Sequence, residues 1–184
     1  MQQEITVTWS AGYVLACLVL ALWLVRLWIR RHASGERASR PRDLASAELV
    51  YMEELFRIRQ PFRLVAKVDR VYRLPGGALV LVEFKTRAQD SPYLTDIIQL
   101  SVQRLAIEGQ TGEAVERYAF VSVLRPNGRL RSHRVRLLDL DEVSNLKRRH
   151  KAILDGHLRP SYAVSEASCR QCALRPRCDR PEPR

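Results

Sequence analysis

Charged residues are missing from one long stretch of this 184-residue chain, which runs from Ile5 to Val25 and is rich in Leu, Val, Ala and Trp. At about 1.5 Å of rise per residue, a helix of this length spans a bilayer core of about 30 Å. A cleaved signal peptide would carry basic residues before its apolar run, whereas here Glu4 precedes the run and arginines follow it. The sequence therefore predicts a transmembrane helix over residues 5–25 within an N-terminal anchor, residues 1–31. The arginine excess after the span predicts a single-pass membrane protein whose C-terminal domain is cytoplasmic.

Acidic residues are also scarce, with twenty Asp and Glu against thirty-one Lys and Arg and a net charge of +11. This excess favours an anionic partner, either nucleic acid or an anionic lipid surface. Six arginines and one glutamate lie between Arg26 and Arg42, where the composition predicts a basic linker over residues 32–42. The rest of the excess belongs mostly to the part of the chain that folds.

Cysteine is the third scarcity, because only Cys17, Cys169, Cys172 and Cys178 occur. The predicted cytoplasmic placement argues against disulfide bonds. Three clustered thiols in a reducing compartment are typical of metal or cluster ligands, so residues 161–184 are predicted to form a Cys-rich metal or iron-sulfur tail. The alternative is a set of surface thiols on a disordered basic tail, although cysteine is rare on such tails.

The remaining residues, 43–160, are long enough for one folded domain with a closed core. Apolar residues at helical spacing predict helices over 43–57 and 94–108, and helical composition predicts a third over 139–155. Runs of strand-forming residues predict strands over 62–73, 78–86, 117–124 and 130–138. This order, without an internal repeat or low-complexity tract, predicts a small mixed α/β or α+β sheet domain.

Two of the predicted strands flank Pro75-Gly76-Gly77, which is a hairpin signal. If these three residues form the loop, Leu74 pairs with Ala78, and counting back along both strands puts Asp69 opposite Glu83.

Two facing carboxylates destabilise a hairpin unless a positive charge lies between them. Lys85 shares a face with Glu83 and supplies part of that charge, and a divalent cation would supply the rest. The alternative is an exposed face with solvated charges. Leu79 and Leu81 argue against it, because they lie on the same face.

Asp69, then Glu83-Phe84-Lys85, then a helix that carries Gln99 resemble the PD-(D/E)XK nuclease superfamily in order and spacing. The segments Lys67–Val71, Val82–Thr86 and Ile98–Leu100 resemble its RecB-like branch. Cys169-x-x-Cys172-x5-Cys178 is similar to the C-terminal cysteine triplet of the CRISPR-associated exonucleases of that branch. The resemblance covers roughly residues 44–178 and implies a restriction-endonuclease-like α/β fold, a mixed sheet flanked by helices, which the predicted transmembrane helix precedes.

The resemblance also implies metal-dependent hydrolysis of DNA, with a catalytic set of Asp69, Glu83, Lys85 and Gln99. In this set Asp69 and Glu83 hold Mg²⁺ or Mn²⁺, and Lys85 positions water and offsets developing phosphorane charge. A hard cation suits two carboxylates with waters and phosphate oxygens.

For the tail, the resemblance implies a four-iron cluster held by Cys169, Cys172, Cys178 and an upstream cysteine. The only upstream cysteine is Cys17. Three possibilities follow: a cluster with a ligand of another kind, a zinc site completed by a residue such as His157, or a remnant without metal.

These expectations combine into a membrane-anchored, metal-dependent DNA nuclease, a RecB-like exonuclease. The alternative is a catalytically inactive nuclease-fold protein that binds DNA or acts as a scaffold at the membrane. The family usually has a histidine before the aspartate and a tyrosine four residues after the glutamine. Here no histidine lies between His32 and His133, and Gln103 stands at the tyrosine position, which favours the alternative.

Overall fold

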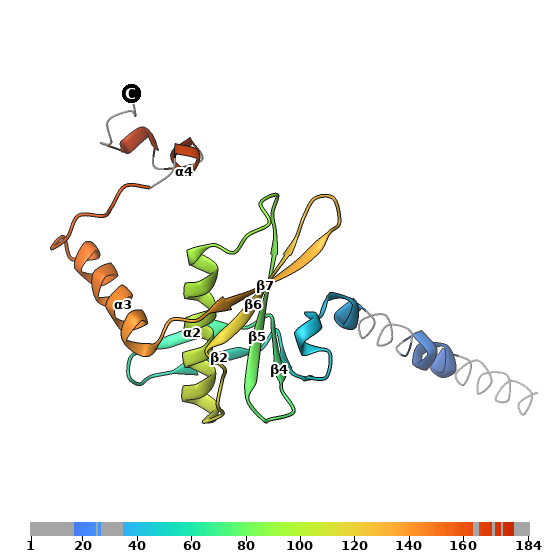
Figure 1. Cartoon of the computed structure of the whole chain (residues 1–184). Coiled ribbons are helices and arrows are strands. Elements are labelled where there is room, and N and C mark those ends of the chain that lie inside the picture. The colour runs from blue at the N-terminus through green and yellow to red at the C-terminus, as the bar shows by residue number, and fades with distance from the viewer. Residues whose placement is uncertain are drawn as a thin grey trace, which may run out of the picture. The chain divides into compact units, whose positions relative to one another are not determined.

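A five-stranded mixed sheet forms the centre of the first of two compact units, Met1–Leu138, in this computed structural model (Figure 1). The structure describes residues 17–24, 26, 35–163, 166–170, 172–173 and 175–178. The strand order is β1 (Glu48–Met52), β4 (Arg70–Arg73), β5 (Leu79–Thr86), β6 (Tyr118–Leu124) and β7 (Leu130–Arg136). Neighbouring strands are antiparallel, except that β5 and β6 are parallel. The predicted mixed α/β sheet is confirmed.

Alternation along β5 gives the sheet two different apolar faces. Leu79 and Leu81 are buried in one cluster, and Val80 and Val82 are buried in another. This is the two-residue period of a strand that is covered on both sides. Since Glu83 and Lys85 continue the Leu79–Leu81 series, both side chains lie on the first face.

Helix α2 (Leu94–Thr111) connects β5 to β6 and packs against the first face. It begins where predicted and ends at Gly112, whose φ of 73° is the left-handed conformation that glycine adopts without strain. Gly109 lies inside the helix instead of ending it. A Cβ there would lie 3.0 Å from Cγ2 of Ile58, so the helix backbone passes very close to its neighbour.

That neighbour is a separate two-stranded sheet of β2 (Leu55–Ile58) and β3 (Leu64–Lys67), and both strands contact α2. The helix predicted over residues 43–57 is therefore wrong. Phe56 and Ile58 are buried on either side of exposed Arg57, which is the period of a strand. The single strand predicted over 62–73 is also wrong, because the chain leaves β3 and enters β4 at Asp69 to join the main sheet.

The second face of the sheet is partly covered by the residues before β1. Residues 35–39 are helical, and η1 (Arg42–Leu44) follows them. Glu36 is 9% exposed and accepts hydrogen bonds from Tyr72 Oη of β4 (2.7 Å) and from Arg40 Nε (2.9 Å). Leu44 packs into the same cluster as Tyr72. This segment is thus fastened to the sheet by a buried ion pair and an apolar contact.

The predicted transmembrane helix over residues 5–25 is contradicted. Among the described residues, no helix is long and apolar enough to cross a membrane. Residues 5–16 and 25 lie outside the described part of the chain. The predicted single-pass membrane localisation, with a cytoplasmic C-terminal domain, depended on this span and is contradicted with it.

The second unit, Asp139–Arg184, contains α3 (Leu140–Leu154), α4 (Glu166–Arg170) and η2 (Arg175–Arg177). Helix α3 agrees with the helix predicted over 139–155. Its first turn is closed by a capping box, in which Asp139 accepts from the Glu142 N–H (2.8 Å) and Glu142 accepts from the Asp139 N–H (2.8 Å).

Candidate active site

The hairpin between β4 and β5 has the predicted register. Leu74 N–H donates to Ala78 O (2.9 Å), and the ladder runs back to the pair Arg70 and Val82. Asp69 immediately precedes β4, and its side chain contacts β5, where Oδ2 of Asp69 accepts a hydrogen bond from the Phe84 N–H (2.8 Å). This bond fixes the Asp69 carboxylate at the end of the ladder, one residue along the strand from Glu83.

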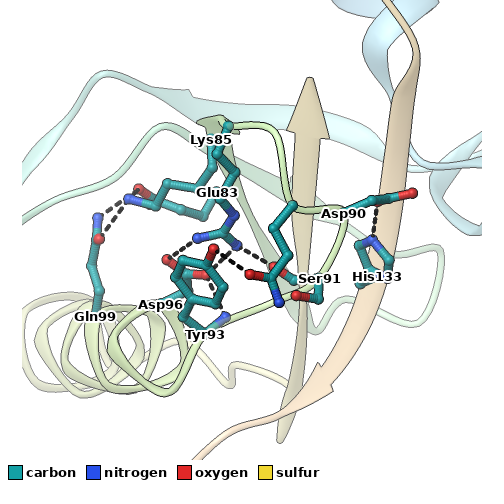
Figure 2. Close-up of polar contacts among 10 residues, drawn as sticks. Glu83, Lys85, Asp90, Ser91, Tyr93, Asp96, Gln99 and His133 are labelled. Carbon is teal, nitrogen blue, oxygen red and sulfur yellow. Dashed lines mark hydrogen bonds and ion pairs between the residues drawn. The ribbon is translucent and has the colours of Figure 1, made fainter. Parts of the chain in front are cut away.

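Glu83 is the best buried carboxylate of the site, with 3% of the residue exposed. Its Oε1 accepts from Gln99 Nε2 (2.7 Å) and Lys85 Nζ (2.7 Å), and its Oε2 accepts from Gln103 Nε2 (3.0 Å). A buried charge is tolerated only when it is paired and hydrogen-bonded, and here the three donors satisfy that requirement. Figure 2 shows Gln99 of α2 and Lys85 of β5 meeting at Glu83.

Lys85 links the strand to the helix at the edge of this cluster. Its Nζ contacts both Glu83 Oε1 and Gln99 Oε1, the latter at 3.0 Å, and 28% of its side chain is exposed. The ammonium group is therefore held in place on its protein side and open on its solvent side.

Burial raises the pKa of the Asp69 carboxyl group above its usual value. The hydrogen bond from Phe84 acts in the opposite direction, and the charge of Glu83 raises the pKa further. Two neighbouring carboxylates short of positive charge suit a hard divalent cation, for which one or two carboxylates plus waters and phosphate oxygens are the usual ligands. Asp69 and Glu83 thus fit a Mg²⁺ or Mn²⁺ ion. Among the described residues, no group of three or more His, Cys, Asp or Glu is gathered for a metal.

The loop after β5 fixes the start of α2. Arg87 pairs with buried Asp96 (Nη2 to Oδ2, 2.6 Å), donates to Ser91 O (2.6 Å) and lies over the ring of Tyr93. Burial alone raises the pKa of Asp96, but the hydrogen bonds from Arg87 and the Tyr93 N–H outweigh it and leave the pKa below its usual value. Asp96 lies in the first turn of α2, so this pair anchors the start of the helix that carries Gln99.

Gln103 has a larger role than the sequence indicated. It is 2% exposed, and its Nε2 bridges Glu83 Oε2 and the carbonyl oxygen of Lys67 (2.8 Å). The four-residue spacing from Gln99 places both amides on one side of the helix, and this signal was visible in the sequence. The Arg87–Asp96 pair had no such signal, because it depends on the path of the loop.

The three tail cysteines lie at short backbone turns. Cys172 N–H donates to Cys169 O (3.2 Å), and Cys178 N–H donates to Arg175 O (3.2 Å), so the tail proceeds by tight turns. Within the described residues, Cys169, Cys172 and Cys178 are not gathered with one another or with His157 into a group that could hold a metal. Cys17 and His157 are both exposed.

Comparison with known proteins gives a family for this arrangement. A solved structure titled "Crystal structure of SSO0001" is 16% identical, with 85% of this chain and 68% of that chain covered and a TM-score of 0.49. No curated protein matches the chain. The model of the PD-(D/E)XK nuclease superfamily matches residues 5–179, nearly the whole sequence. The chain belongs to the PD-(D/E)XK nuclease superfamily.

Proposed function

We propose that this chain is a Mg²⁺- or Mn²⁺-dependent deoxyribonuclease of the RecB-like branch that hydrolyses phosphodiester bonds as an exonuclease. Membership of the superfamily supports a nuclease-type hydrolase, since its members usually use a divalent metal and act on nucleic acid. The observation that carries the proposal is the burial of Glu83 among Lys85, Gln99 and Gln103, beside the fixed carboxylate of Asp69.

Asp69 and Glu83 would supply the carboxylate oxygens that hold the ion. A bound divalent ion stabilises charge on phosphoryl oxygens and makes a bound water more acidic. Lys85 has a free side toward solvent, where its ammonium group offsets the negative charge of the pentavalent phosphorus and orients the attacking water. Gln99 holds Lys85 and Glu83 in one geometry, and Gln103 ties Glu83 to the backbone of β3.

The test uses the purified full chain and end-labelled single-stranded and duplex DNA, with Mg²⁺, Mn²⁺ or a chelator. We expect cleavage only with metal, and its loss in Asp69→Asn and Glu83→Gln. Release of mononucleotides from one end supports the exonuclease assignment, whereas internal cuts contradict it.

A second candidate function is a nuclease-fold protein that binds DNA without cutting it. The absence of a histidine between His32 and His133 favours it. DNA binding with no metal-stimulated cleavage on any of these substrates would support this function and contradict the first.

The tail adds a proposed metal centre. Cys169, Cys172 and Cys178 hold either an iron-sulfur cluster, with a fourth ligand that is not a cysteine of the tail, or a zinc ion completed by a residue such as His157. The spacing of the cysteines supports this proposal, because Cys169-x-x-Cys172 is a common zinc half-site and Cys178 follows it closely in the sequence. The proposed division of the chain keeps the nuclease domain at 43–160 and the Cys-rich tail at 161–184.

A further inference from the structure

A basic cavity lies at the turn between β6 and β7. It has a volume of about 500 Å³ and is lined by Asp90, Arg125, Arg129, Leu130 and Arg131. The arginines come from the hairpin that ends β6 and begins β7, and Asp90 comes from the loop after β5. Since one water molecule occupies about 30 Å³, a phosphate group fits in this cavity together with several waters.

The cavity lies on the same face of the sheet as the candidate active site. Lys85 pairs with Val123 across β5 and β6, and Val123 pairs with Arg131 across β6 and β7. Residues paired in register point to the same face, so Lys85 and Arg131 are in one row, two strand spacings apart. That separation is about 10 Å between the two backbones.

The cavity carries more positive than negative charge. Three guanidinium groups face the single carboxylate of Asp90. That carboxylate is bound closely by His133 (Nε2 to Oδ1, 2.7 Å), as Figure 2 shows. Arg131 binds it only loosely (Nη1 to Oδ2, 3.5 Å). The side chain of Arg131 is 71% exposed. The Nε of Arg125 is buried and has no hydrogen-bond partner among the described residues.

A buried guanidinium nitrogen without an acceptor is costly, and an incoming oxyanion would satisfy it. Arginine is the side chain best suited to this, because its planar fork donates two parallel hydrogen bonds to a phosphate.

We propose that Arg125, Arg129 and Arg131 form a phosphate-binding subsite that holds a backbone phosphate of the nucleic-acid substrate near the bond that is cut. The inference rests on the proposed nuclease function. The subsite holds the strand in register while Asp69, Glu83 and Lys85 act on the scissile phosphate. Its contribution is to affinity and positioning, and it takes no part in bond cleavage.

The experiment measures binding of a fluorescent DNA oligonucleotide to the full chain by anisotropy, in chelator so that nothing is cut, over a range of salt concentrations. We expect Arg129→Ala and Arg131→Ala each to weaken binding several-fold, and the double variant by about tenfold or more, as for lost hydrogen bonds to a charged group. The slope of log affinity against log salt should become shallower by about one for each contact removed. Arg136→Ala is the matched control, since it lies on the same strand, on the opposite face.

Both test residues are exposed, so folding should survive, and thermal unfolding of each variant checks this. If Arg131→Ala is destabilised, Arg131→Gln keeps a polar side chain without the charge and should show the same weakening. Wild-type affinity and salt slope in the double variant would overturn the inference, as would an equal loss in Arg136→Ala.

Two further measurements distinguish a DNA phosphate from free phosphate, and distinguish the phosphate subsite from the proposed nuclease function. Inorganic phosphate at the same concentration as the bound DNA should not displace it from the protein. If phosphate does displace DNA from wild type but not from Arg129→Ala, the cavity is a site for free phosphate instead. Glu83→Gln should lose cleavage and keep arginine-dependent DNA binding. Cleavage that needs Glu83 together with arginine-independent binding would leave the proposed function intact and contradict this inference.

Discussion

Glu83 is a buried carboxylate that accepts hydrogen bonds from Lys85, Gln99 and Gln103. The candidate site is built around this residue. Its pairing with Asp69 could be predicted from the sequence, because Pro75-Gly76-Gly77 fixed the loop length and strand pairing has a period of two. The four-residue spacing also predicted that Gln99 and Gln103 share one side of the helix, but not that Gln103 contacts both Glu83 and the Lys67 carbonyl oxygen. That contact depends on the β2–β3 ribbon, because Lys67 belongs to β3, and this ribbon was predicted as part of a helix and part of a longer strand.

Lys85→Ala should lower the rate of DNA cleavage at least about a hundredfold, because preorganised positive charge on the transition state is worth this much or more. Binding of DNA in chelator should stay within a few-fold of wild type, since Lys85 acts on developing charge. Steady-state cleavage rates and anisotropy on the same preparation check both values.

The control for this change is Lys151→Ala, a lysine in an exposed pair with Asp155 on α3, which should cut DNA at the wild-type rate. If Lys85→Ala cuts DNA as fast as wild type, Lys85 has no catalytic role.

Gln103→Leu tests a positioning residue that does not touch the substrate. The change leaves Glu83 Oε2 and the Lys67 carbonyl oxygen without their donor in a buried place, at a cost of about 1–3 kcal/mol in the free energy of unfolding. We expect kcat to fall while KM changes little, because Gln103 is 2% exposed. Urea unfolding and steady-state kinetics measure the two effects.

The control is Gln110→Leu, at the exposed end of the same helix, which should lower the free energy of unfolding by less and leave kcat unchanged. Equal behaviour of the two variants would reject a special role for Gln103.

At the scale of elements, the strongly periodic segments were predictable and the segments with competing patterns were not. Helix α2 and strands β5, β6 and β7 lie within a few residues of their predicted ranges because each carries one clear period between turn signals. Residues 43–57 carry apolar residues that fit a helix on spacing alone, but Phe56 and Ile58 are both buried by α2 as members of a strand. Tertiary packing decided that segment.

The segment before β1 contributes to stability through Glu36. Burial raises the pKa of Glu36, but hydrogen bonds from Arg40 and Tyr72 outweigh this and hold the pKa below its usual value of 4.5. Burial and the hydrogen bond to Glu36 raise the pKa of Tyr72 to about 12. A carboxyl group with a lowered pKa stabilises the folded state above its usual pKa, and this stabilisation is lost as the pH falls through the lower folded value.

Glu36→Gln should therefore lower the free energy of unfolding at pH 7, and the difference from wild type should shrink as the pH falls below 4.5. Urea unfolding at a series of pH values from 7 down to 3 measures this. Glu53→Gln, whose partner Lys67 is exposed, should change stability by less than about 0.5 kcal/mol at every pH. A deficit in Glu36→Gln that is constant over the whole range would show that the charge of Glu36 is irrelevant.

For the whole molecule, the net charge of +11 fits a nucleic-acid partner. Part of that charge is now assigned to a place, because the arginines of the β6–β7 turn share a face with the candidate active site. The family could be identified from Asp69, Glu83, Lys85 and Gln99 in the sequence, since their spacing reflects one hairpin and one helix. The membrane anchor could not be judged from an apolar run alone.

The second unit provides the last prediction, because its cysteines are the one feature of the sequence that the fold leaves unassigned. Full-length protein purified without oxygen should contain iron and show a broad brown absorption if Cys169, Cys172 and Cys178 hold a cluster, and this is the result that the family resemblance favours. Colourless protein with about one zinc per chain would select the zinc site, which three thiolates and one imidazole satisfy.

In both cases metal binding orders a segment that has little apolar surface of its own, so Cys172→Ser should lower the thermal stability of the tail and increase its cleavage by protease. Asp69→Asn should leave the metal content of the tail unchanged, which separates this centre from the nuclease site. Protein that holds neither iron nor zinc, with a tail that protease cuts equally fast with and without Cys172, would show that the triplet binds no metal.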